Sequence, residues 1–232
     1  MIHDPVHQQL VLDTLCTNLQ DPIPAIRAKA AQALGQIGSE QAIPALLQLL
    51  EDPDTSVRWR VAEALGRISS EQSIPALLHL VEDANSNVRS SAAEALGKIS
   101  GEQTIPALLK LLEDADSDVR SSAAEALGNI GNEQAMTALL RLLTDSDATV
   151  RQTTAIALGN IPASTVLPPL LETLQQTNPI LRQTAAIALG QLNQESAIPA
   201  LVQLLKDPET QVRESAIEAL GKMGSVIDRS VA

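Results

Sequence analysis

The chain has 232 residues, and its 28 acidic against 16 basic side chains give a net charge of −12, which disfavours nucleic acid and anionic membrane surfaces as partners. The single cysteine excludes an internal disulfide and fits a reducing, cytoplasmic compartment, and no apolar run approaches the roughly 20 residues of a membrane span. Phe and Tyr are absent and Trp occurs once, so the sequence favours thin layers of stacked helices over a compact globular core.

A period of 31 residues runs along the chain and predicts an array of repeats. The decapeptide VRSSAAEALG occurs twice, at residues 88–97 and 119–128. An arginine and a glycine recur at the same step seven times: Arg27, Arg58, Arg89, Arg120, Arg151, Arg182 and Arg213, and Gly35, Gly66, Gly97, Gly128, Gly159, Gly190 and Gly221. We therefore expect one domain over residues 1–224 and a tail at 225–232, with seven units at about 5–38, 39–69, 70–100, 101–131, 132–162, 163–193 and 194–224.

The sequence pattern of each unit predicts two helices. The first is clearest at IPALLQLLED, residues 43–52, where Pro44 suits a first turn and an Asp-Pro-Asp sequence ends the helix. The second covers TSVRWRVAEALGRI, residues 55–68, with an apolar face of Val57, Val61, Ala64, Leu65 and Ile68. A glycine inside this helix costs about 1 kcal/mol, so its recurrence predicts close approach of a neighbouring helix. Since one helix pair leaves an apolar face uncovered, the predicted fold is an all-α, right-handed α-solenoid of seven two-helix repeats.

The unit VRxxAAEALGxIG…IPALLxLLxD resembles the HEAT repeat over roughly residues 5–224. It is most similar to the short, regular form found in bilin-lyase subunits that service phycobiliproteins and in artificial consensus scaffolds. The resemblance implies a surface for binding proteins, and it leaves open a second role as an accessory subunit of a bilin lyase or a phycobiliprotein-handling factor. HEAT-like deoxyhypusine hydroxylases carry metal-binding His-Glu dipeptides, which this sequence lacks, so that enzyme is excluded.

The seven arginines suggest either an anion-binding ladder or a structural one. The structural interpretation is favoured because an aspartate precedes most of them by six residues. Such an arginine can form a bidentate ion pair with the inter-helix turn of its own or the next unit. The aspartates are Asp21, Asp52, Asp83, Asp114, Asp145 and Asp207, and the sixth unit carries Gln176 instead.

The residues that differ between repeats are the candidates for partner binding. We expect several second-helix positions to point outward on one face, among them the residues on either side of Val-Arg. Units two to four carry an acidic ladder with basic and small polar neighbours: Trp59, Arg60, Glu63, Arg67, Ser90, Ser91, Glu94, Lys98, Ser121, Ser122 and Glu125. Units five and six replace the ladder with an apolar group of Ile156, Ile180 and Ile187, which is bordered by Gln152, Gln183, Thr153 and Thr184.

Two alternatives stay open at these positions. Trp59 is either an interface residue, a role in which tryptophan is enriched, or a cover for the first unit. The three isoleucines form either a binding patch or local packing. Residues 160–183 hold four prolines, and Pro168-Pro169 are placed near a helix start, which predicts altered curvature or a hinge.

No catalytic, cofactor-binding or metal-ligating residue is predicted. His3 and His7 could share a helix face but lie at the N-terminus, and Cys16 falls on an apolar helix face, where we expect a buried thiol. The predicted function is a non-enzymatic scaffold, expected to be monomeric, that binds an unidentified protein partner across the second-helix face. A fragment of a longer protein and an engineered array are the other interpretations of the repeats.

Overall fold

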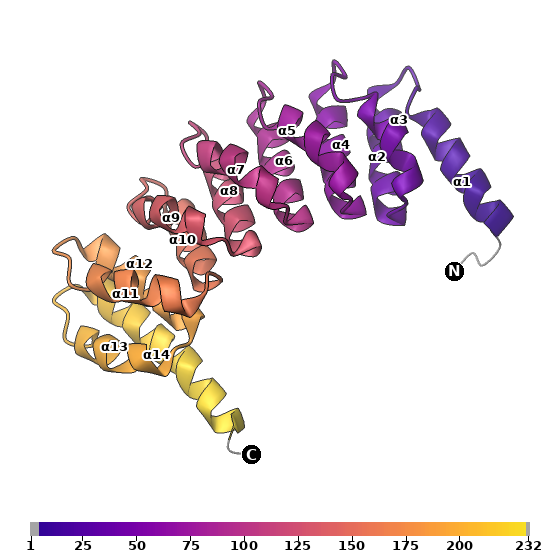
Figure 1. Ribbon diagram of the computed structural model, residues 1–232. Coiled ribbons are helices and arrows are strands. Elements are labelled where there is room, and N and C mark those ends of the chain that lie inside the picture. Colours follow the sequence, from indigo (N-terminus) through magenta and orange to yellow (C-terminus); the bar gives the residue numbers. More distant parts are fainter. Residues whose placement is uncertain (1–4, 231–232) are drawn as a thin grey trace. The chain divides into compact units, whose positions relative to one another are not determined.

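The computed structural model describes residues 5–230, and the side chains of residues 5–224. Within that range the chain forms fourteen α-helices, five short 3-10 helices and no strand, so the predicted all-α class is confirmed (Figure 1). The first helices of the repeats are α1 (Pro5–Asn18), α3 (Ile43–Leu47), α5 (Ile74–Leu80), α7 (Ile105–Leu111), α9 (Met136–Leu142), α11 (Ala163–Thr173) and α13 (Ile198–Leu204). The second helices are α2 (Pro24–Ile37), α4 (Thr55–Ile68), α6 (Ser86–Ile99), α8 (Ser117–Ile130), α10 (Ala148–Gly159), α12 (Pro179–Leu192) and α14 (Thr210–Ser230).

Helix α4 shows why the second helices form where the sequence places them. Asp54 caps the helix, because its carboxylate accepts a hydrogen bond from the Ser56 amide at 2.8 Å. The helix ends at Ile68 and is capped by Ser69, which adopts the left-handed conformation with φ of 56°. Val57, Val61 and the other apolar residues of the predicted face are buried, so the helix predicted over residues 55–68 is confirmed.

The first helices are shorter than predicted. Helix α3 ends at Leu47, whereas the sequence predicted a helix to Asp52. Beyond Leu47 the backbone tightens into turns, with the Leu49 amide 3.0 Å from the Leu46 carbonyl and the Asp52 amide 3.2 Å from the Leu49 carbonyl. The polar links before five of these helices form single 3-10 turns: Glu40–Ala42, Glu71–Ser73, Glu102–Thr104, Glu133–Ala135 and Glu195–Ala197.

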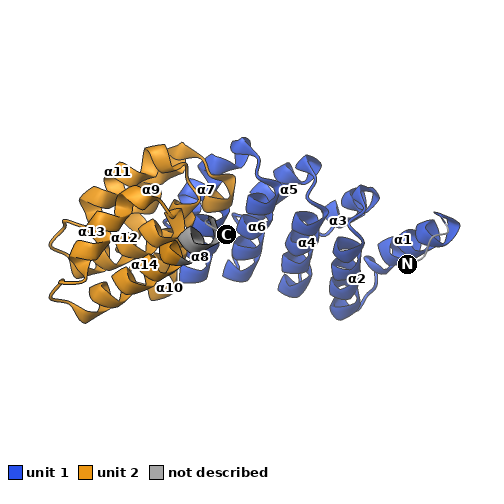
Figure 2. Cartoon of the chain, turned by 90° about the horizontal axis from the view of Figure 1, so that it is seen from below, with its two compact units in different colours: residues 1–126 blue, residues 127–232 orange. Residues whose placement is uncertain are grey.

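The chain contains two compact units, residues 1–126 and 127–232, which Figure 2 shows in separate colours. We call them unit 1 and unit 2, and from here on each 31-residue element of the sequence is called a repeat. In unit 1 the second helices pack in series, α2 against α4 and α4 against α6. In unit 2 helix α12 packs against both α10 and α14. Helix α14 continues to Ser230 through most of the segment assigned to a tail. A single array over residues 1–224 stays a prediction.

The recurrent glycine lets successive second helices approach closely. A Cβ added to Gly66 would lie 2.6 Å from the Cβ and 2.8 Å from the Cα of Ala95, inside van der Waals contact. The predicted packing role of this glycine is therefore confirmed. The same relation joins four further pairs, each 29 residues apart: Gly35 with Ala64, Gly97 with Ala126, Gly128 with Ala157, and Gly190 with Ala219.

Unit 2 departs from this regular packing between α10 and α12. A Cβ at Gly159 would meet Gln191, three residues beyond the position that the other pairs predict. Three residues correspond to about 4.5 Å along a helix, so the register is shifted by nearly one turn. The placement of Pro168-Pro169 near a helix start was wrong, because α11 begins at Ala163 and holds both prolines in its interior. Each proline removes one backbone hydrogen bond from that helix.

Candidate protein-interaction site

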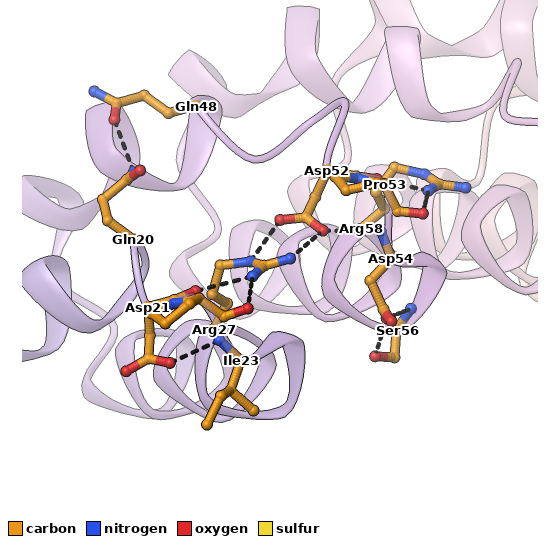
Figure 3. Close-up of polar contacts among 11 residues, drawn as sticks. Gln20, Asp21, Ile23, Arg27, Gln48, Asp52, Pro53, Asp54, Ser56 and Arg58 are labelled. Carbon is orange, nitrogen blue, oxygen red and sulfur yellow. Dashed lines mark hydrogen bonds and ion pairs between the residues drawn. The ribbon is translucent and has the colours of Figure 1, made fainter.

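Most of the recurrent arginines join successive repeats. Arg27 donates from Nε and Nη2 to the Asp52 carboxylate of the next repeat at 2.7 and 2.8 Å (Figure 3). Its Nη1 donates to the backbone carbonyl of Asp21 at 2.9 Å, so the side chain bonds the turn of its own repeat as well. We call this arrangement the Arg–Asp clamp. It recurs at Arg58–Asp83, Arg89–Asp114 and Arg182–Asp207.

The clamps are largely shielded from solvent, with 12% to 17% of each arginine side chain exposed in the four pairs. Hydrogen bonds from Arg89 and Arg182 lower the pKa values of Asp114 and Asp207. Burial opposes ionisation of Asp83, but the Arg58 guanidinium, the Asn85 amide and Arg89 together outweigh it, so the pKa of that carboxyl also falls below its usual range. These guanidinium groups are already bonded, which argues against an anion-binding role.

The bond to the turn of the arginine's own repeat also recurs at the other three arginines. Arg120, Arg151 and Arg213 donate to the carbonyls of Asp114, Asp145 and Asp207 at 2.8, 2.7 and 2.6 Å. Along the chain, the carboxylate that each clamped arginine binds lies 25 residues further on. For Arg151 that position is Gln176, so the clamp has no carboxylate there.

A cleft of about 510 Å³ crosses the second helices of unit 1. Three successive repeats contribute to it, with one residue from α4, four from α6 and three from α8. We call it the Trp59 cleft; its lining is Trp59, Asn87, Ser90, Ser91, Glu94, Asp118, Ser121 and Ser122. Six of these eight residues are among the candidates drawn from the sequence. Asn87 and Asp118 occupy the position just before Val-Arg, which was expected to point outward, but they were not among the residues proposed to bind a partner.

Small side chains explain why the cleft exists. Serine takes the two positions after Arg89 and again the two after Arg120, where the preceding repeat carries Trp59 and Arg60. The expectation that Ser122 points outward was wrong. Its side chain is buried, and its hydroxyl lies 2.8 Å from that of Ser90, so the pair links α6 to α8 in the wall of the cleft.

A smaller cleft of about 240 Å³ adjoins the same tryptophan, and Glu63, Ser91, Glu94 and Lys98 help to line it. Glu63 accepts hydrogen bonds from Arg60 at 2.6 Å and Arg67 at 2.8 Å. Burial opposes ionisation of Glu63, but these two bonds outweigh it and lower its pKa. The Arg60 guanidinium also lies 3.8 Å from the centre of the Trp59 ring.

Glu94 behaves differently from Glu63. Partial removal of water raises its pKa above the usual 4.5, and repulsion from Glu125 and Glu63 adds to that effect. Attraction from Lys98 and a hydrogen bond from Ser122 act in the opposite direction without cancelling it. Glu94 therefore carries a negative charge that its surroundings compensate incompletely.

Trp59 itself is half-buried and faces the residues of α6 and α8 that line the cleft. The lining includes no residue of α1 or α2. Trp59 therefore contributes to a cleft formed with α6 and α8, and both interpretations of its role stay predictions.

The candidates of unit 2 lie on α10 and α12, two helices that pack together. Ile156 and Ile180 are each 38% exposed, whereas Ile187 and Gln183 are half-buried and Gln152 is exposed. The assignment of Thr184 to the border of an exposed patch was wrong. It is buried, and its hydroxyl donates to the Ile180 carbonyl at 2.8 Å within its own helix.

Cys16 is half-buried on α1, not fully buried as the sequence predicted. Burial and the nearby Asp13 raise the pKa of its thiol. Residues 1–4, which include His3, lie outside the described residues, and His7 is exposed on α1. Among the described helices, none combines the length and apolar character needed to cross a bilayer.

The paired helices, packed in series and joined by clamps and glycine contacts, define an α-solenoid built from two-helix repeats. The chain matches HEAT repeats over residues 12–97, 43–128, 77–159, 105–183 and 167–232, and it belongs to the HEAT-repeat family. No curated protein sequence matches the chain.

Several solved structures share this fold. One is the complex of CpcE and CpcF of phycocyanin lyase from Nostoc sp. PCC7120, with 24% identity, a TM-score of 0.61, and coverage of 93% of this chain and 94% of that one. The Escherichia coli protein YibA is 25% identical, with a TM-score of 0.62 and coverage of 93% and 82%. An engineered protein is 28% identical, with a TM-score of 0.52 and coverage of 95% and 69%.

Proposed function

We propose that the chain is a non-enzymatic scaffold that binds a partner protein across the second helices, with the Trp59 cleft as its central contact. The observation that carries the proposal is the lining of this cleft. Positions that vary over the seven repeats gather there on three neighbouring helices, with the same Ser-Ser pair on α6 and α8, while the arginine and glycine that recur in every repeat are engaged in clamps and packing. A scaffold whose repeats are already clamped together orders few groups on binding, which favours affinity.

The proposal is tested by affinity capture from a lysate of the native host. Quantitative mass spectrometry compares the wild-type chain with Trp59→Ala, and we expect the partner recovered by the wild type to be lost from the variant. Tryptophan is enriched among the residues that dominate interface energies, so the loss should be about tenfold or more. Circular dichroism should show unchanged helicity, because Trp59 is only half-buried.

His79→Ala is the matched control, because His79 is an exposed side chain on the first helix α5, outside both clefts. Ile156→Glu tests whether the exposed isoleucines of unit 2 extend the interface. Equal recovery of the partner by the wild type, Trp59→Ala and His79→Ala would show that the partner does not use the Trp59 cleft.

A role as accessory subunit of a bilin lyase is the second candidate. The supporting observation is the similarity to the phycocyanin-lyase complex over almost the full length of both chains. Titration of a free bilin with the chain, alone and with its captured partner, tests this role by visible absorbance. A shifted pigment spectrum supports the lyase role, and an unchanged spectrum with both samples removes it.

A further inference from the structure

The Trp59 cleft has charge of only one sign among its lining residues. Glu94 and Asp118 supply two carboxylates, and the other six lining residues are an aromatic, an amide and four hydroxyls. Arg60, whose guanidinium lies 3.8 Å from the centre of the Trp59 ring, and Arg67 are both bonded to Glu63. The cleft therefore offers acceptors and negative charge without a competing cation in its own lining.

We propose that the cleft receives an arginine side chain from a basic segment of the partner protein. The apolar stem and guanidinium plane lie against Trp59, and the donors of the guanidinium bond Glu94 and Asp118. This inference rests on the proposed scaffold function and specifies the chemistry of its partner.

The dimensions of the cleft fit a peptide segment better than a lone ion. Its volume of about 510 Å³ falls within the range of about 300–1,000 Å³ that is typical of ligand sites. Arginine suits the lining better than lysine, because its planar group stacks on an aromatic ring and presents several donors in a fixed fork. Arg60 already places a guanidinium 3.8 Å from the centre of the same ring.

The electrostatics of Glu94 support the same occupant. Three glutamates occupy equivalent positions on α4, α6 and α8, and two of them repel the third. Two arginines compensate the negative charge of Glu63, whereas the main positive charge near Glu94 is that of Lys98. A cation entering beside Glu94 would relieve this repulsion, whereas an acidic segment would increase it.

Trp59 is the only tryptophan in the sequence, so its fluorescence reports directly on occupancy of the cleft. The probe is a nine-residue glycine–serine peptide with arginine at every third position. The control peptide replaces each arginine with citrulline, which keeps the shape of the side chain and removes its charge. We expect the arginine peptide to change Trp59 emission in a saturable manner and the citrulline peptide to leave it unchanged.

Charge-removing variants locate the binding. Glu94→Gln and Asp118→Asn should each lower the affinity for the arginine peptide by about threefold. The double variant should lower it by about tenfold, as expected for partly exposed ion pairs. Glu102→Gln is the matched control, because it removes one negative charge of unit 1 from an exposed residue outside both clefts. It should leave the affinity unchanged at 150 mM salt, where distant charges are screened.

Three results would each overturn the inference: no change in Trp59 emission, equal binding of both peptides, or equal weakening by Glu102→Gln and Glu94→Gln. Competition with the captured partner separates this inference from the scaffold function. Partner recovery can be lost from Trp59→Ala and yet be unchanged by Glu94→Gln, Asp118→Asn and added arginine peptide. In that case the scaffold function stands and the proposed arginine recognition is wrong. If recovery does not depend on Trp59, the proposed interface itself fails.

Discussion

Thr154 on α10 is fully buried, and its hydroxyl has no hydrogen-bond partner among the described residues. A buried hydroxyl without a partner lowers stability by about 1–3 kcal/mol. Replacing it with a methyl group of similar size removes that cost. We expect Thr154→Val to raise the free energy of unfolding by about 1 kcal/mol, measured by urea denaturation.

Thr184 on α12 provides the matched control for this prediction. It is also buried, but its hydroxyl donates to the Ile180 carbonyl at 2.8 Å. The same substitution, Thr184→Val, removes that bond and should lower the free energy of unfolding by about 1 kcal/mol. A stability loss of equal size in both variants would contradict the assignment of Thr154 as unpartnered.

Glu94 makes a prediction about the dependence of stability on pH. Its pKa in the folded chain lies above the usual 4.5, so the folded state binds the proton more tightly than the unfolded state. The contribution of Glu94 to the free energy of unfolding is therefore largest at low pH. It falls as the pH rises from the pKa of the unfolded state through that of the folded state. The groups that set this balance are Glu63, Glu125, Lys98 and Ser122.

Glu94→Gln removes this titration. Relative to wild type, we expect the variant to gain about 0.5 kcal/mol at pH 7, a typical magnitude for exposed charge interactions, and to gain nothing at pH 3. Urea denaturation at both pH values measures the difference. Glu102→Gln controls for the general effect of removing one negative charge, and a gain for Glu94→Gln that is independent of pH would refute the explanation.

At the scale of the helices, the glycine contact makes the clearest prediction. Gly66→Ala gains about 1 kcal/mol in helix propensity, but the added Cβ would lie 2.8 Å from the backbone of Ala95. Overpacking of this kind costs about 1–3 kcal/mol, and here the obstacle is a neighbouring helix backbone that cannot rotate away. We expect Gly66→Ala to lower the melting temperature.

Gly221 on α14 is the matched position, since it occupies the same place in the repeat and, among the residues whose side chains are described, no atom lies within 4 Å of an added Cβ. Gly221→Ala should therefore raise the melting temperature through helix propensity alone. Opposite signs for the two substitutions, measured by thermal denaturation, would establish that interhelical approach selects the glycine. Stabilisation by both would refute it.

Some elements could be predicted from sequence because their causes are local. Helix α4 is specified by its cap at Asp54 and by its apolar spacing, and both of its ends match the prediction. The early end of α3 was missed, since its apolar residues continue past Leu47 while the backbone tightens into turns. The register shift at Gly159 depends on how α10 and α12 settle against each other, which a repeat period cannot reveal.

The candidate site was predictable only in part for a similar reason. The register indicated which positions vary, and six of them line the Trp59 cleft. The depth of each side chain depends on the size of its neighbours across the helix interface. Ser122 contacts the small side chain of Ser90 and is buried, whereas Trp59, which occupies the position of Ser90 one repeat earlier, is half-buried.

At the scale of the whole molecule, the Arg–Asp clamp is complete at several repeats and lacks its carboxylate at one. Arg27, Arg58 and Arg89 form complete clamps in unit 1, and Arg182 forms one in unit 2. In unit 2, Arg151 has Gln176 at the position of the carboxylate, and the neighbouring α11 carries two prolines in its interior. Both features reduce the interactions that hold α10 and α11 in place.

We therefore expect the backbone amides of α10 and α11 to exchange hydrogen about tenfold faster than those of α4 and α6, a ratio that corresponds to about 1.4 kcal/mol in local opening free energy. Hydrogen exchange followed by mass spectrometry measures this for each helix. Gln176→Asp supplies the missing carboxylate and should slow exchange in α10, whereas Gln175→Asp adds the same charge to an adjacent exposed residue and should not. Equal exchange rates in the two units would show that the clamp does not set local stability. Equal effects of Gln176→Asp and Gln175→Asp would show the same, because these two variants differ only in whether the new charge can reach Arg151.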